Sequence, residues 1–205
     1  MHVKKEFFPV MGFTILYVII FSIVALLRRN YEFLVYIFVI GIIFFLVLAY
    51  LDKRFNQLSL WGLSIWGFLH MCGGNIFFSG IRLYDIQLIP VILRYDQLIH
   101  AFGFGVATFV AYQLLEPYLK DNIKKWKLLS FLIIMIGMGF GALNEVVELF
   151  AMLMYKNAGV GDYYNNAFDL VFNLIGAIIA ILLINLSRIK SEREKDSGKV
   201  KKKIK

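Results

Sequence analysis

GALNEVVELF, residues 141–150, places Asn144, Glu145 and Glu148 inside a run that is otherwise apolar from residue 128 to residue 154. Placing one charged side chain at the centre of a membrane helix costs about 2.5–3.5 kcal/mol on insertion scales, so acids at this depth usually face other protein segments and mark functional sites. The stretch therefore predicts a membrane-spanning helix whose polar face is buried against neighbouring helices. The polar partners of these residues must then come from other parts of the chain.

The composition of the chain is that of a membrane protein. Hydrophobic residues make up 60% of the 205 residues and the mean hydropathy is +0.72, whereas soluble domains are nearer about half apolar. A bilayer crossing takes about 20 apolar residues, so this length accommodates about six crossings and leaves no room for a soluble catalytic domain. We expect an all-α bundle of about six transmembrane helices in the plasma membrane of a prokaryote.

The positive charge is concentrated near the C-terminus. Nine of the 22 Lys and Arg residues follow Leu186, and a basic tail after a last crossing fixes the topology or attracts anionic lipid head groups. The net charge of +8 therefore indicates membrane lipids as partners and no nucleic acid. We expect residues 1–187 to form the transmembrane domain and residues 188–205 to form a disordered cytoplasmic tail.

Six apolar runs define the expected crossings, at residues 10–27, 33–51, 60–78, 95–115, 128–154 and 166–186. The segment 79–94 is too short and too polar to span, so we expect it to lie on the surface or to re-enter the membrane. Together with the loop 159–170, it could cover a pocket. With six crossings, every Lys and Arg lies on the side of the two termini except Arg28, Arg29, Arg82, Arg94 and Lys156. The positive-inside rule then places both termini in the cytoplasm.

This topology brings polar side chains from four crossings to one layer in the outer half of the membrane. Three of the pairs in this layer are three or four residues apart, which places each pair on one helix face. The layer contains His70, Asp96, His100, Glu145, Glu148, Asp169 and Asn173. Four buried carboxylates require compensation, so we expect a counter-ion such as Arg94 or Arg82, a divalent metal ion, or carboxyl groups that stay protonated.

Carboxylate oxygen and imidazole nitrogen together suit zinc, manganese or iron, although the chain has no H-E-x-x-H signature. Three roles are expected for the polar residues. The expected metal ligands are His70, His100, Glu148 and Asp169; the expected catalytic residues are Glu145, Glu148, Asp96 and His100; the expected substrate-binding residues are Arg94, Asn144, Asp162 and Asn173. Simpler alternatives remain: His70 as an interhelical hydrogen-bonding residue, Asp169 as a helix cap, and the acids as a structural ion-pair network with Arg94.

Four short motifs resemble the YjdF-like bacterial inner-membrane proteins. These motifs are HMCGG from His70, RYDQLIH from Arg94, NEVVE from Asn144, and GVGDYYNNAFDLVFNLIGA at residues 159–177. The patterns D-x-x-x-H, E-x-x-E and D-x-x-x-N-x-x-G are more distantly similar to the VanZ-like family, which is linked to teicoplanin resistance, although Glu148 stands where that family commonly has Gln. The resemblance covers residues 70–177 and implies a polar site at the positions already singled out.

Three functional hypotheses follow. The first is an outer-face membrane enzyme that acts on a lipid-linked or otherwise amphiphilic envelope substrate, with Glu145 or Glu148 as base or metal ligand. The second is a binder or transporter whose acidic pocket holds a cation, a proton or a cationic amphiphile. The third is a buried polar network that only specifies helix packing.

Overall fold

The computed structural model describes residues 5–119, 125–155 and 161–203. The predicted lid residues 159 and 160 therefore lie outside the described residues. The elements, in chain order, are η1 (Lys5–Phe7), α1 (Phe8–Leu27), α2 (Tyr31–Arg54), α3 (Gln57–Asn75), β1 (Phe77–Phe78), β2 (Ile81–Arg82), η2 (Leu83–Asp85), β3 (Gln87–Ile89), β4 (Leu93–Arg94), α4 (Tyr95–Leu115), η3 (Glu116–Tyr118), α5 (Trp126–Met154) and α6 (Tyr163–Lys203).

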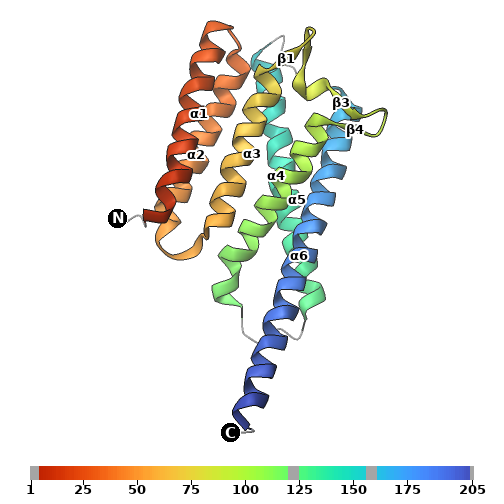
Figure 1. The fold of residues 1–205 in the computed structure, drawn as a ribbon. Helices are drawn as coiled ribbons and strands as arrows, with labels where there is room; N and C mark the ends of the chain where they lie inside the picture. Colours follow the sequence, from red (N-terminus) through yellow and green to blue (C-terminus); the bar gives the residue numbers. More distant parts are fainter. Residues whose placement is uncertain (1–4, 120–124, 156–160, 204–205) are drawn as a thin grey trace.

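The six α-helices lie side by side and alternate in direction (Figure 1). The short strands β1–β4 lie at one end of the bundle, and both chain ends lie toward the other. Four helical segments in the described part of the chain are long and apolar enough to cross a membrane: Lys5–Leu27, Tyr95–Tyr118, Trp126–Met154 and Tyr163–Ser191. A shorter apolar helix, Tyr31–Val47, accompanies them. The predicted all-α membrane bundle is confirmed, whereas six crossings and cytoplasmic termini stay predictions.

In the described part of the chain the buried core has three parts, the smallest of which contains Phe7, Val10 and Leu60. Aromatic residues of α1, α2 and α3 form the first part, in which Tyr17, Phe33 and Met71 are buried. The second part lies between α4, α5 and α6, where Ile133 and Ile181 are buried. The candidate site described below lies where α4, α5 and α6 meet near the end that carries the strands.

Glycines allow α4, α5 and α6 to approach closely. On α6, Gly176 has no room for a Cβ atom because the backbone of Ala101 on α4 occupies that position. A Cβ atom at Gly141 on α5 would meet the Asn173 side chain of α6, with the Nδ2 atom at 2.5 Å. Small residues at such crossings let helix backbones come close enough for polar side chains to meet. The glycines therefore bring together the helices that carry the polar residues.

The segment between α3 and α4 forms two antiparallel hairpins, β1–β2 and β3–β4, at the end of the bundle (Figure 1). The sequence did not predict these hairpins, and the surface-lying or re-entrant position of the segment stays a prediction. Ser79 and Gly80 have φ angles of 50° and 82°, and two successive left-handed residues form the tight turn that joins β1 to β2. The second tip includes Val91, which is 93% exposed and has a φ of 67°.

Several helix boundaries differ from the sequence expectation by two or three residues, and two of the differences change the kind of structure that was expected. The third crossing was expected to continue to residue 78, but α3 ends at Asn75 and the next residues enter β1. Disorder was expected from residue 188, whereas α6 continues as a helix to Lys203. A run of Lys, Glu and Arg has good helix propensity, so the end of the apolar run does not terminate the helix. The division of the chain at residue 187 stays a prediction.

Candidate functional site

The first turn of α4 is capped by the side chain of Gln97, which accepts a hydrogen bond from the backbone of Arg94. The backbone N–H of Arg94 donates to Oε1 of Gln97 over 2.8 Å, and Gln97 is buried. This cap starts the helix at Tyr95, so Asp96 lies at its second position and His100 one turn further along the same face. Near the N-terminus of a helix the backbone dipoles favour a negative charge, which suits the position of Asp96.

His100 is at the centre of the site. It is buried, and three carboxylates surround its ring: Nε2 is 3.6 Å from Oδ1 of Asp96 and 3.9 Å from Oε1 of Glu148, and Nδ1 is 3.8 Å from Oε1 of Glu145. Nδ1 also lies 3.0 Å from Oδ1 of Asn173, which is fully buried. An N–H at Nδ1 that donates to Asn173 leaves the Nε2 lone pair free for a proton or a metal ion.

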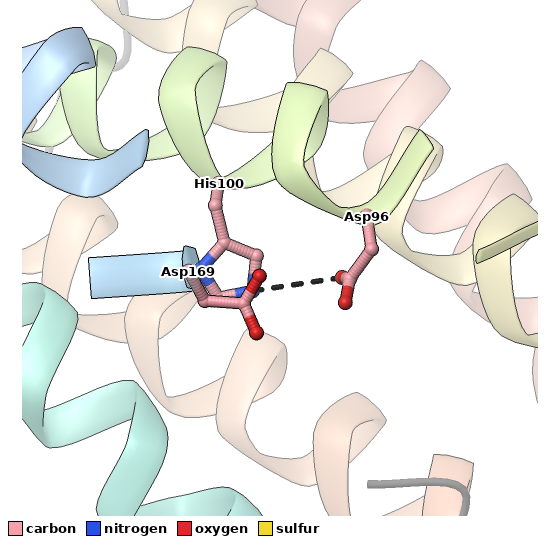
Figure 2. Close-up of side chains that lie close together, drawn as sticks. All are labelled: Asp96, His100 and Asp169. Carbon is pink, nitrogen blue, oxygen red and sulfur yellow. Dashed lines mark ion pairs between the residues drawn. The ribbon is translucent and has the colours of Figure 1, made fainter. Parts of the chain in front are cut away.

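α6 contributes the fourth acid, Asp169, which is fully buried. Figure 2 shows its carboxylate beside the His100 ring, with Asp96 on the far side of the dashed contact. One ligand atom each from Asp96, His100 and Asp169 lie within 4.8 Å of one another, and the same holds for His100, Glu145 and Glu148. The last three α-helices of the chain therefore supply two groups of metal-binding type that share one histidine.

Asn165 is the site residue that the sequence reasoning missed. Its Nδ2 atom donates to Asp169 over 2.8 Å and to Asp96 over 3.2 Å, and its Oδ1 accepts a bond of 3.1 Å from Nη1 of Arg94. The amide thus links the arginine to two acids. Its position four residues before Asp169 places it on the same helix face, and this spacing was the signal in the sequence that could have identified it.

On α5, Asn144 and Glu148 form another hydrogen-bonded pair that is four residues apart. The Asn144 amide donates to Oε1 of Glu148 over 2.7 Å, and Glu148 is buried. Both carboxylate oxygens of Glu145 are buried without a hydrogen-bond partner, as is Oδ1 of Asp169. Buried polar atoms without partners are rare and costly, so the structure contains acceptor atoms that a ligand would satisfy.

Two residues expected at the site lie elsewhere. His70 on α3 belongs to neither of the two groups; its Nδ1 and carbonyl oxygen contact the Tyr84 hydroxyl, and its ring packs against Tyr36. Burial raises the pKa of Tyr84 well above its usual value, so the phenol keeps its proton. Asp162 is exposed, and its Oδ1 accepts the backbone N–H of Asn165 over 3.0 Å. That contact caps the start of α6, so the structure gives Asp162 a structural position.

No ion pair with Lys or Arg is formed by Asp96, Glu145, Glu148 or Asp169 within the described part of the chain. The predicted ion-pair network with Arg94 is therefore replaced by the Arg94–Asn165 contact. In a low-dielectric interior, four carboxylates with one imidazole need protons or a bound cation. Chemically, the arrangement offers oxygen and nitrogen ligands to a metal ion and a free carboxylate beside it.

A family model described as "Predicted membrane protein (DUF2238)" matches residues 9–190. The match extends well beyond residues 70–177, where the motifs were recognised, and it includes α1 and α2. Comparisons with curated proteins and with solved structures give no match. The likeness to YjdF-like proteins is compatible with this result, and the VanZ-like relation stays a prediction. The chain belongs to this family of predicted membrane proteins.

Proposed function

We propose that the protein is a membrane enzyme that binds a divalent metal ion through Asp96, His100 and Asp169 and acts on the head group of an amphiphilic envelope substrate. The observation that carries the proposal is the fully buried Asp169, whose Oδ1 has no hydrogen-bond partner although it lies in a group with His100 and Asp96. A buried carboxylate oxygen without a partner is costly, and a cation bound there removes that cost.

The spacing of the donor atoms supports a metal ion. Two ligands that are each about 2.1 Å from one ion lie at most about 4.2 Å apart. The Nε2 atom of His100 is 3.6 Å from Oδ1 of Asp96, which falls within this limit, and the ligand atoms of Asp96, His100 and Asp169 all lie within 4.8 Å of one another. One imidazole with two or three carboxylates suits zinc, manganese or iron. Asn173 orients the imidazole from the other side, as partners of metal-binding histidines commonly do.

Each residue of the site has a separate role in the proposed enzyme. A divalent ion would polarise the substrate and increase the acidity of a bound water molecule. Glu145, whose two carboxylate oxygens have no hydrogen-bond partner, would take the proton as a general base. Asn144 holds Glu148, and the Arg94–Asn165 contact positions the two remaining acids. In the proposed orientation, with both termini cytoplasmic, this machinery lies in the outer half of a prokaryotic plasma membrane.

The unpartnered oxygens of Glu145 favour a second candidate function. A binder or transporter of a cation or proton also needs buried acids that lack fixed counter-ions. Such a protein would bind its ion reversibly and show no turnover.

Calorimetric titration of the purified full chain with Zn²⁺ and Mn²⁺ tests the proposal. We expect one ion per chain, and a loss of affinity greater than about 100-fold in Asp169→Asn, since removal of a mere supporting residue already costs about 10–100-fold. Asp85→Asn, at an exposed carboxylate in η2, is the matched control and should bind like the wild type. Equal affinity in the two variants, or no saturable binding by the wild type, would contradict the metal site.

A further inference from the structure

An apolar cavity of about 640 Å³ lies next to the acidic site, between α2, α3, α4 and α5. Its volume falls in the range of about 300–1,000 Å³ that is typical of small-molecule sites. Its walls are almost entirely hydrocarbon, with Phe104, Ala107 and Val110 from α4 among the lining residues. Water would find few hydrogen-bond partners there, so the surface suits an apolar occupant.

The cavity has polar side chains at the end nearest to the acidic site. His70 and Asn144 line it there, and the Asn144 amide is the group that donates to Glu148. Asn144 is therefore shared between the cavity wall and the acidic site. From this end the cavity continues toward the opposite end of the bundle, where Leu114 and Phe55 line it.

The length of the cavity corresponds to one membrane leaflet. On α4, the lining extends from Phe104 to Leu114, which at about 1.5 Å per residue is about 15 Å. The hydrocarbon core of a bilayer is about 30 Å thick, so one lipid chain covers about half of it. A single extended hydrocarbon chain therefore matches the cavity in length as well as in polarity.

The rim of the cavity gives a chain a way in from the membrane. Ile43 and Leu46 on α2 are 37% and 51% exposed, and Phe140 and Leu143 on α5 are 44% and 60% exposed, although all four line the cavity. In a bilayer these exposed side chains contact lipid. The cavity thus opens sideways between α2 and α5, and a lipid chain can enter without crossing water.

We propose that the cavity is the seat for one hydrocarbon chain of a membrane lipid, whose head group reaches Glu148 and His100. The proposed substrate is thereby an amphiphile that is bound by its tail and processed at its head. The part that concerns the head group rests on the proposed metal site, since four carboxylates accept an anionic head only when a cation is bound. The seat for the chain is independent of the metal.

Photo-crosslinking tests this seat. The full chain is placed in phosphatidylcholine nanodiscs that contain a trace of phosphatidylglycerol with a diazirine on one acyl chain, and the adducts are mapped by mass spectrometry. We expect adducts on Ala107 and Val110 inside the cavity in excess over Val171 and Ile178, which lie on α6 outside it and are 50% and 40% exposed. Adducts that follow the exposure of the residues alone would overturn the proposal.

A cavity-filling variant provides the matched comparison. Val110→Phe places a ring in the cavity, whereas Val171→Phe makes the same change on an exposed surface. Labelling of Ala107 should fall about tenfold in the first variant, which is equivalent to about 1.4 kcal/mol, and should not change in the second. Equal labelling in the two variants contradicts the seat, and the wild-type adduct map decides the question if Val110→Phe does not fold.

The Asp169→Asn variant separates the two proposals. Retained labelling of the cavity together with lost metal binding supports both the chain seat and the metal site. Labelling of the cavity by a wild type that binds no metal supports the seat and contradicts the proposed function. Metal binding by a wild type whose cavity is not labelled contradicts the seat and leaves the proposed function standing.

Discussion

Replacement of Gly176 by Ala should open the crossing of α4 and α6 on which the site depends. The added methyl group would meet the carbonyl oxygen of Ala101, a backbone atom that cannot move by changing a rotamer. Carbon–oxygen contacts settle at about 3.3–3.6 Å, so the two helices must separate by on the order of 1 Å. The His100–Asn173 contact is 3.0 Å, and such a movement would break it.

The expected cost is the sum of two effects. Overpacking of a close-packed interface costs about 1–3 kcal/mol, and the loss of one hydrogen bond between membrane helices adds about 0.6–1.7 kcal/mol. The higher helix propensity of Ala offsets about 0.8–1 kcal/mol of this cost, so we expect Gly176→Ala to lower the free energy of unfolding by roughly 1–4 kcal/mol. The affinity for a divalent ion should fall as well, because the imidazole of His100 loses the partner that orients it.

Unfolding in mixed detergent micelles, followed by circular dichroism, measures the change in stability. Gly139→Ala is the matched control, since no atom lies within 4 Å of a Cβ atom built there. Ala exceeds Gly in helix propensity by about 0.8–1 kcal/mol, so this control should equal or exceed the wild type in stability. If Gly176→Ala were as stable as Gly139→Ala, the reasoning about the crossing of α4 and α6 would be wrong.

Three further substitutions test separate parts of the account. Asn165→Ala should weaken metal binding by about 10–100-fold in calorimetric titration, while Asn166→Ala, which removes a buried carbonyl oxygen without a partner, should leave the affinity at the wild-type value. Tyr84→Phe removes the hydroxyl that contacts His70, so it should lower the free energy of unfolding by about 0.5–1.5 kcal/mol. Because His70 lies outside the proposed site, the number of metal ions bound per chain should not change. A change in that number would contradict the position of His70. Val91→Gly should raise the melting temperature, since a β-branched residue at a φ of 67° carries about 1–2 kcal/mol of strain. A lower melting temperature would show that this strain is absent.

Much of the bundle could be predicted from hydropathy alone. The apolar run at residues 95–115 coincides with α4, and the run at residues 128–154 differs from α5 only at its start. Length and apolarity determine these helices, since a membrane leaves the backbone no other way to satisfy its hydrogen bonds. The hairpins at residues 77–94 could not be predicted in this way, because tight turns outside the membrane depend on local chemistry such as that of Ser79 and Gly80.

The candidate site was predictable only where spacing reveals a shared helix face. Asp96 with His100 and Glu145 with Glu148 were found by their spacing, and both pairs converge on the same imidazole. His70 was predicted to join them because its depth in the membrane is similar. Depth does not determine the direction in which a side chain points. The ring of His70 contacts the hydroxyl of Tyr84, which lies in the segment after α3. Asn165 was not predicted as a site residue because a short polar residue near a loop is commonly a turn residue.

The most direct test of the proposed metal site is an anomalous-scattering map from crystals of the wild-type chain grown with Mn²⁺ or Zn²⁺. The account predicts one strong peak among the carboxylates of Asp96 and Asp169 and the Nε2 atom of His100, at about 2.0–2.2 Å from its ligand atoms. The peak should be absent in Asp169→Asn crystals grown in the same way. A wild-type map without a peak at these residues, or with an equal peak in the variant, would contradict the claim that this layer of acids is a metal site.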